Sequence, residues 1–179
     1  MVIYTQARRK ALKRKVAIKM ARNLEVKYGT IKNNLLKDIN KKRKDYIDLE
    51  NPIVQRFGGD IWATGRASMV YIIPEDKFDL PYEIKEDRAS EMKSILLKVS
   101  GADKYFLDFD CVTSPRNFKN LLKFHVVGKL NKFVHLNAQL VKKFGDYKKL
   151  VFVNNGDIYS PVGVYKYGVL IGVIMPIRL

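Results

Sequence analysis

The chain of 179 residues is long enough for one folded domain with a real core, and its net charge of +16 excludes an ordinary near-neutral globular protein. A single cysteine, Cys111, excludes an internal disulfide framework and favours a reducing, cytoplasmic setting. The longest apolar run, 169–177, is too short to cross a membrane, and the basic N-terminus has no apolar region of a secretory signal behind it.

The positive charge is concentrated near the N-terminus. Residues 1–44 contain 15 Lys/Arg and two Asp/Glu, a net charge of +13, whereas residues 45–179 have a net charge of only +3. We therefore expect two parts, a basic helical arm over 1–50 and an α+β domain over 51–179.

The spacing of apolar residues predicts two helices in the arm. Residues 5–29 carry an apolar residue at every fourth position from Leu12 to Leu24, and Gly29 suits a helix stop. A second helix is predicted to begin at the cap Thr30, with an apolar stripe that consists of Ile31, Leu35 and Ile39. Both apolar stripes are narrow, so each helix is expected to pack along one side against another surface. Most of its circumference would face solvent or a ligand.

The remaining chain is predicted to be rich in strands. Gly58-Gly59 suits a hairpin turn between 53–57 and 60–74. A strand over 78–84 would lead into a helix over 85–99, whose stripe is Met92, Ile95, Leu96 and Val99. Residues 104–112 alternate like a half-buried strand, which places Cys111 on the apolar face as a small core residue.

The last part of the chain predicts a strand, a short helix opened by Asn137, and a three-stranded meander over 148–179. Residues 78–130 begin in a similar way, with strand, helix and strand, although 117–130 fits a helix or a strand equally well. The sequence therefore predicts an internal repeat of a strand–helix–strand–strand–strand unit.

The C-terminal segment resembles that of the bacterial DNA sliding clamp, the β subunit of the replicative polymerase. Clamps end in a strand reading approximately V-x-M-P-[MIV]-R-L, and here the stretch reads "VIMPIRL". The stretches "FVHLNAQLVKKF" and "IYSPVGV" resemble the strand, helix and strand that precede it in clamps. "IWATGRASMVYIIP" resembles the clamp's "ATDGHRL" turn more loosely, because no Asp follows Thr64 and the His is missing. Residues 1–50 do not share the likeness.

This resemblance implies a clamp-like domain and a hydrophobic cleft that receives short linear peptides from partner proteins. It implies a partner-binding set of Thr64, Val173, Met175, Pro176, Ile177, Arg178 and Leu179. Methionine suits such a cleft because its flexible side chain adapts to several partners. Two other interpretations remain open: the strand is simply part of the core, or it forms an interface with a second copy.

The arm favours nucleic-acid binding, DNA more than RNA. The residues expected to contact phosphates are Arg8, Arg9, Lys10, Lys13, Arg14, Lys15, Lys19, Arg22, Lys41, Lys42, Arg43 and Lys44. No base-reading motif is evident, so we expect phosphate contacts without sequence choice and a steep salt dependence. A solvated charge run or an acidic protein partner would leave the same pattern. The narrow stripes lack Trp and Phe, which disfavours binding to a membrane surface.

No catalytic constellation stands out, and we expect a non-enzymatic protein without a cofactor or metal. His125 and His135 have no further ligand at a zinc-like spacing, and no phosphate-binding glycine loop occurs. The first hypothesis is a clamp-like, DNA-associated factor. The alternative is a basic structural protein of a nucleoprotein or ribosome, with a purely structural C-terminal strand. The third and weakest hypothesis is a metal-dependent nuclease that uses Asp108 and Asp110.

Overall fold

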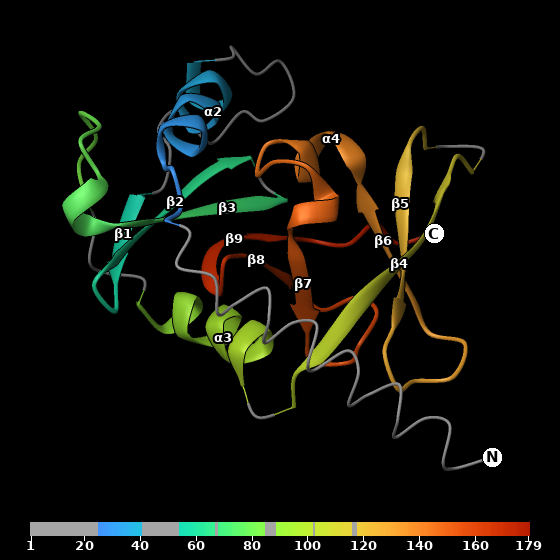
Figure 1. Ribbon diagram of the computed structural model, residues 1–179. Coiled ribbons are helices and arrows are strands. Elements are labelled where there is room, and N and C mark those ends of the chain that lie inside the picture. Colours follow the sequence, from blue (N-terminus) through green and yellow to red (C-terminus); the bar gives the residue numbers. More distant parts are fainter. Residues whose placement is uncertain (1–24, 41–53, 67, 85–88, 102, 116–117) are drawn as a thin grey trace.

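A computed structural model describes residues 25–40, 54–66, 68–84, 89–101, 103–115 and 118–179 (Figure 1). Its strands are β1 (Val54–Phe57), β2 (Asp60–Arg66), β3 (Met69–Pro74), β4 (Tyr105–Thr113), β5 (Leu121–Val126), β6 (Phe133–Asn137), β7 (Val151–Asn154), β8 (Val162–Lys166) and β9 (Val169–Ile174). Its helices are α2 (Gly29–Asn40), α3 (Ala89–Ser100) and α4 (Ala138–Lys142), with short 3₁₀ turns η1 (Glu75–Lys77) and η2 (Tyr147–Lys149). The predicted α+β class is confirmed.

The strands form one antiparallel sheet in the order β1-β2-β3-β9-β8-β7-β4-β5-β6. The predicted hairpin at Gly58-Gly59 is present, and both glycines have positive φ, which explains why glycine is needed there. Residues 60–74, which the sequence suggested as one strand, turn back near Ser68 into β2 and β3. Residues 117–130, left open between helix and strand, contain β5.

Helices cover both faces of the sheet (Figure 1). Successive residues of β2 and β3 belong to two different hydrophobic clusters, as the alternation of a strand requires. The larger cluster lies under α2 and α4, and Gly172 of β9 is required in it because a Cβ there would overlap the ring of Phe144. The smaller cluster lies under α3 and contains Trp62, a core residue as the sequence predicted.

α2 packs in the same core as the strands, although the sequence analysis assigned it to the arm. Ile31 is 3% exposed and Leu35 is fully buried against the sheet. The side chain of Asp38, also buried, accepts a hydrogen bond from the hydroxyl of Tyr71 on β3 (2.7 Å) and is paired with Lys143 after α4. The boundary expected at residue 50 therefore does not separate α2 from the folded body.

Two segments share the order of a helix followed by a three-stranded meander: α2 with β1–β3, and α4 with β7–β9. Their last strands, β3 and β9, pair antiparallel in the sheet, with Val70 opposite Val173. Their helices adjoin, because the amide of Asn34 donates to the carbonyl oxygen of Lys143 at 2.7 Å. Residues 78–130, the expected first copy, instead have no strand over 78–84, and their helix α3 lies on the opposite face.

The prediction that Cys111 is buried is wrong, because its side chain is exposed. The register of β4 against β5 shifts between Phe109 and Cys111, where Phe109 faces Phe124 and Cys111 faces Lys123. This bulge inserts Asp110 as an extra residue and turns the following side chain to the other face of the sheet. None of the described helices combines the length and apolarity needed to span a membrane.

Candidate partner-binding site

The C-terminal segment continues beyond β9 and is held by its backbone. The Met175 N–H donates to the carbonyl oxygen of Ser68 (2.9 Å), and the Ile177 N–H donates to that of His135 (2.8 Å). Because His135 is on β6, this bond joins the segment to the strand at the end of the sheet order. The segment thus crosses from the centre of the sheet toward its edge.

The side chains of this segment differ in exposure. Those of Met175 and Leu179 are 39% and 60% exposed, while Pro176 and Ile177 are half-buried. The guanidinium of Arg178 lies 5.3 Å from the ring centre of Tyr159, itself an exposed aromatic residue. The sequence analysis did not single out Tyr159, although it lies within the "IYSPVGV" stretch.

Two predicted members of the site lie deeper. Val173 is 2% exposed and packs under α3 with Trp62 and Ile72. Thr64 of β2 is half-buried and lies opposite Val70, which in turn lies opposite Val173. The structure therefore brings Thr64 and Val173 onto the same sheet face, in one row, with β3 between them.

His135 accepts the Ile177 N–H through its backbone oxygen, and the pKa of its side chain is shifted. Burial, and then the positive charge of Lys123 on the neighbouring strand, lowers the pKa of the His135 imidazole below its ordinary value. The ammonium of Lys123 lies 3.9 Å from the ring centre of Phe133 and is paired with Asp110 at 3.0 Å. A neutral imidazole is thus favoured beside the segment at neutral pH.

The two carboxylates considered for a nuclease, Asp108 and Asp110, are exposed side chains of β4. Asp110 is engaged by Lys123, and Asp108 is opposite His125 in the β4–β5 register. Over the described ranges, no three His, Cys, Asp or Glu side chains come together at a spacing that suits a metal ion.

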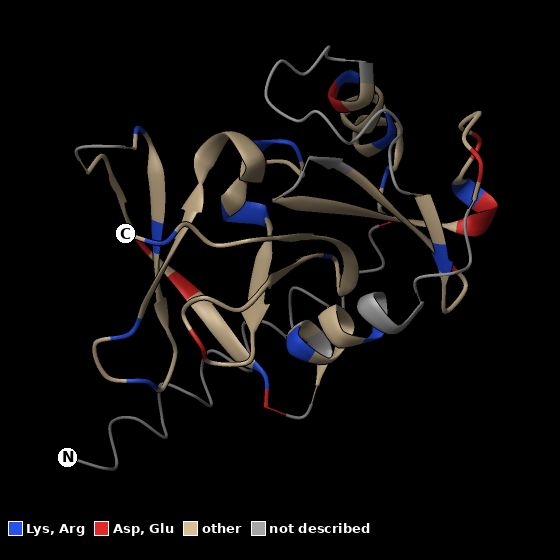
Figure 2. Cartoon of the chain, turned by 180° about the vertical axis from the view of Figure 1, so that it is seen from behind, with Lys and Arg blue, Asp and Glu red and all other residues tan. Residues whose placement is uncertain are grey.

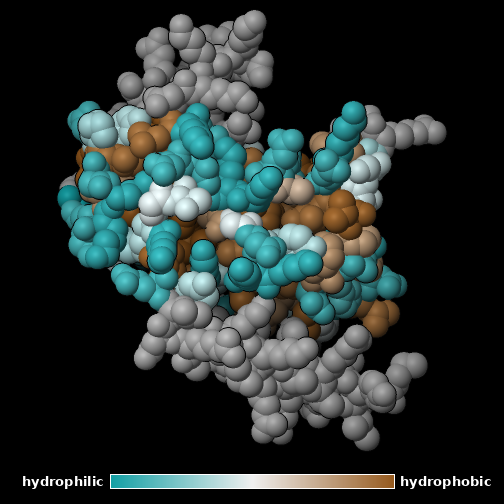
Figure 3. All heavy atoms as spheres, turned by 45° about the horizontal axis from the view of Figure 1, so that its top comes forward, coloured by the Kyte–Doolittle hydropathy of each residue, from teal (hydrophilic) through white to brown (hydrophobic). Residues whose placement is uncertain are grey.

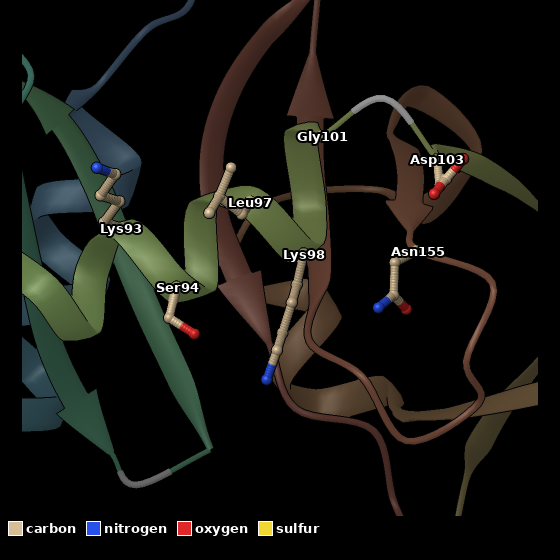
Figure 4. A pocket seen from close by; sticks show the side chains of 7 residues that line it. All are labelled: Lys93, Ser94, Leu97, Lys98, Gly101, Asp103 and Asn155. Atoms are coloured by element: carbon tan, nitrogen blue, oxygen red, sulfur yellow. The ribbon is translucent and has the colours of Figure 1, made fainter.

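One pocket of about 590 Å³ opens at the C-terminal half of α3 (Figure 4). Its helix side is formed by Lys93, Ser94, Leu97 and Lys98, and Asp103 and Asn155 face them from other segments. None of the residues predicted for the partner-binding set lines it. Its lining mixes charged, polar and apolar side chains.

In the view of Figure 3, hydrophilic side chains cover much of the described surface, and apolar side chains form patches between them. The large exposed apolar residues among those described are Leu97, Phe109, Val112, Leu130, Tyr159, Val169, Met175 and Leu179. Three of them, Tyr159, Met175 and Leu179, belong to the C-terminal segment or to its aromatic neighbour, so this region is one place where apolar surface gathers.

The twelve arm residues predicted to contact phosphates lie outside the described residues. Within the described body, however, the charge is uneven: residues 118–150 contain eight Lys and one acidic residue, Asp146 (Figure 2). This basic segment is hidden in the net charge of +3 over 45–179, but a charge count in shorter windows reveals it.

Comparison of the chain with protein-family models, with curated proteins and with solved structures gives no match in any of the three.

Proposed function

We propose that this chain is a non-enzymatic, DNA-associated factor that resembles one domain of a sliding clamp. The basic arm binds nucleic acid without sequence choice, and the C-terminal segment binds a short peptide of a partner protein or a second subunit. The observation that carries the proposal is the C-terminal segment itself, whose backbone is hydrogen-bonded to Ser68 and His135 while Met175 and Leu179 stay exposed.

An apolar side chain on a fixed backbone is well prepared for binding. The fold has already fixed its backbone, so little conformational entropy is lost on binding. Burial of such a side chain by a partner therefore contributes up to about 1.5–3 kcal/mol to the free energy of binding. Met175 meets this condition through its own backbone bond, and Leu179 follows two residues after the bond of Ile177. The Arg178–Tyr159 contact adds a charged and aromatic border. Such a mixture of Met, Arg and Tyr is typical of protein interfaces.

The paired units support the likeness to a clamp domain. By resemblance, such a domain consists of two copies of one unit, and the α2 and α4 units of this chain adjoin through helices and last strands. One domain of this size cannot encircle DNA alone. Either several copies assemble, or the arm keeps the chain on DNA through charge instead of topology.

The arm is tested by neutralising its charges. In the full chain, Arg8, Arg9, Lys10, Lys13, Arg14, Lys15, Lys19 and Arg22 are changed to Gln, and binding to labelled duplex DNA, single-stranded DNA and structured RNA is measured across a salt series. Each lost phosphate contact removes about 0.9 from the salt slope on duplex DNA, so we expect a slope several units smaller and far weaker binding.

The matched control neutralises lysines of the basic segment in the body: Lys119, Lys129, Lys132, Lys142, Lys148 and Lys149. This variant should keep most of the slope if the arm is the principal nucleic-acid element. If the control loses the slope and the arm variant keeps it, the body holds the site and the arm has another partner.

The second candidate is a basic structural nucleic-acid-binding protein. The observation in its favour is the burial of Val173, which makes β9 a core strand. The two candidates differ in what the side chains after β9 do: they bind a partner in the first and only support the fold in the second.

The variant Met175→Ser with Leu179→Ser separates them, because it removes two exposed side chains and leaves the backbone bonds in place. The docking proposal expects an unchanged urea midpoint together with loss of binding to peptides selected from a random capped hexapeptide library, or loss of self-association in sedimentation. Deletion of 175–179 also removes two hydrogen bonds, worth about 0.5–1.5 kcal/mol each, and should still leave a folded chain. Unfolding of the double-serine variant would favour the structural candidate.

A further inference from the structure

Two polar side chains lie unpartnered under α3. Gln55 of β1 is 1% exposed, and neither its Nε2 nor its Oε1 has a hydrogen-bond partner. The Nε1 of Trp62, which is opposite Gln55 in the β1–β2 register, is also buried without a partner. Buried polar groups are almost always hydrogen-bonded, so three unpaired atoms on adjacent strands require an explanation.

The helix above them is held largely by apolar side chains. Among the side chains described between 93 and 99, Val99 is buried, Ile95 and Leu96 are half-buried, and Leu97 is 61% exposed. The Tyr165 hydroxyl on β8 also donates a hydrogen bond to the carbonyl oxygen of Val99 at 3.2 Å.

The sheet face under α3 continues into the candidate site. Gln55, Trp62 and Ile72 share this face with the row formed by Thr64, Val70 and Val173. The row contains Thr64 and Val173, and Val173 is the one buried member of the predicted partner-binding set. α3 reaches the row because Gly163 lacks a Cβ, which would lie 3.0 Å from the Cβ of Val99.

We propose that this face is the deep part of the peptide-binding surface and that α3 is its displaceable cover. A partner peptide moves α3 aside, places apolar side chains against Trp62 and Val173, and pairs a backbone amide with the Gln55 carboxamide. This inference rests on the proposed peptide docking at the C-terminal segment.

The chemistry of the unpaired atoms selects the ligand. A carboxamide offers both a donor and an acceptor, and its natural complement is another amide. The indole N–H of Trp62 needs an acceptor such as a peptide carbonyl. An extended peptide supplies both groups from its backbone and presents its side chains to the apolar row.

The experiment uses the full chain, in which Trp62 is the sole tryptophan. Capped hexapeptides selected from a random library are titrated while the Trp62 emission maximum is recorded. Hydrogen exchange of the α3 amides is then measured with and without the best peptide. We expect a shift of the emission and faster exchange across 89–100 in the complex, with unchanged exchange in β2 and β3.

Two variants of Gln55 sharpen the test. Gln55→Leu and Gln55→Met remove the unpaired atoms at similar volume, so each should raise the melting temperature of the free chain by about 2–4 °C. Each should also weaken the selected peptide about tenfold, the effect of one lost hydrogen-bonding pair. The control Leu97→Ser changes the exposed side of α3 and should alter neither property.

The other outcomes contradict the inference in distinguishable ways. A lower melting temperature in both Gln55 variants would mean that buried water satisfies the amide and that the face is purely structural. A second such result is a selected peptide that binds the full chain and loses its binding in the Met175→Ser, Leu179→Ser variant, yet changes neither the Trp62 emission nor the hydrogen exchange of α3. That result would contradict the role of α3 as a cover and would support the proposed function. If no peptide is selected at all, the cover and the peptide-docking form of the proposed function both fail, and docking of a second subunit is then decided by sedimentation.

Discussion

At the scale of single residues, the buried pair between Asp38 and Lys143 is expected to dominate the attachment of α2. Asp38 is 2% exposed and also accepts the Tyr71 hydroxyl, whereas the Lys143 side chain keeps some contact with solvent. Lys143→Met would remove a charged hydrogen-bond donor from this buried carboxylate, so we expect a loss of about 1.5–3 kcal/mol in urea unfolding. Asp38→Asn should cost less, because its amide oxygen can still accept from Tyr71.

α2 also supplies the control for this prediction. Lys32 pairs with Asp79 at 2.7 Å, but the Asp79 side chain is 72% exposed, so solvent screens the interaction. The side-chain hydrogen bond from Lys32 lowers the pKa of Asp79. Lys32→Gln should change the free energy of unfolding by less than about 1 kcal/mol. If Lys143→Met and Lys32→Gln lower the free energy of unfolding equally, the buried Asp38–Lys143 pair stabilises the fold no more than the exposed Lys32–Asp79 pair.

At the scale of helices and strands, the sequence predicted those features that depend on residues close together in the chain. Asn137 caps α4 by accepting the Gln139 N–H at 2.8 Å, and the meander over 148–179 is present as expected. Ile95, Leu96 and Val99 of the predicted α3 stripe pack in the smaller cluster, whereas the side chain of Met92 lies outside the described residues. The exposure of Cys111 could not be predicted, because the bulge depends on how β4 pairs with β5. Residues 78–84 look like a strand locally, yet no strand of the described sheet pairs with them.

The candidate site was predictable only in part, for the same reason. Met175 and Leu179 were singled out through the C-terminal motif, and the structure shows that both are exposed. The place of α3 over Val173, the orphaned amide of Gln55 and the neighbouring Tyr159 all arise from contacts between segments far apart in the chain. A pattern within one strand or helix contains no information about such contacts.

At the scale of the whole molecule, the packing of α2 changes where the chain can be divided. Ile31 and Leu35 are nearly or fully buried in the main cluster, and burial of each is worth about 1.5–3 kcal/mol. A truncation to 45–179 removes both, exposes Tyr71 and leaves Lys143 without its partner. Against a total stability of about 5–15 kcal/mol, we expect this chain to lose its cooperative urea transition.

A truncation to 25–179 is the matched comparison, because it removes the first part of the arm and keeps α2 whole. It should unfold cooperatively with a midpoint close to that of the full chain, as followed by Trp62 fluorescence and far-ultraviolet circular dichroism. Cooperative unfolding of 45–179 at the same midpoint would mean that α2 contributes little and that the arm does extend to residue 50. Loss of the transition in 45–179 alone would place the functional boundary before α2 and assign that helix to the body.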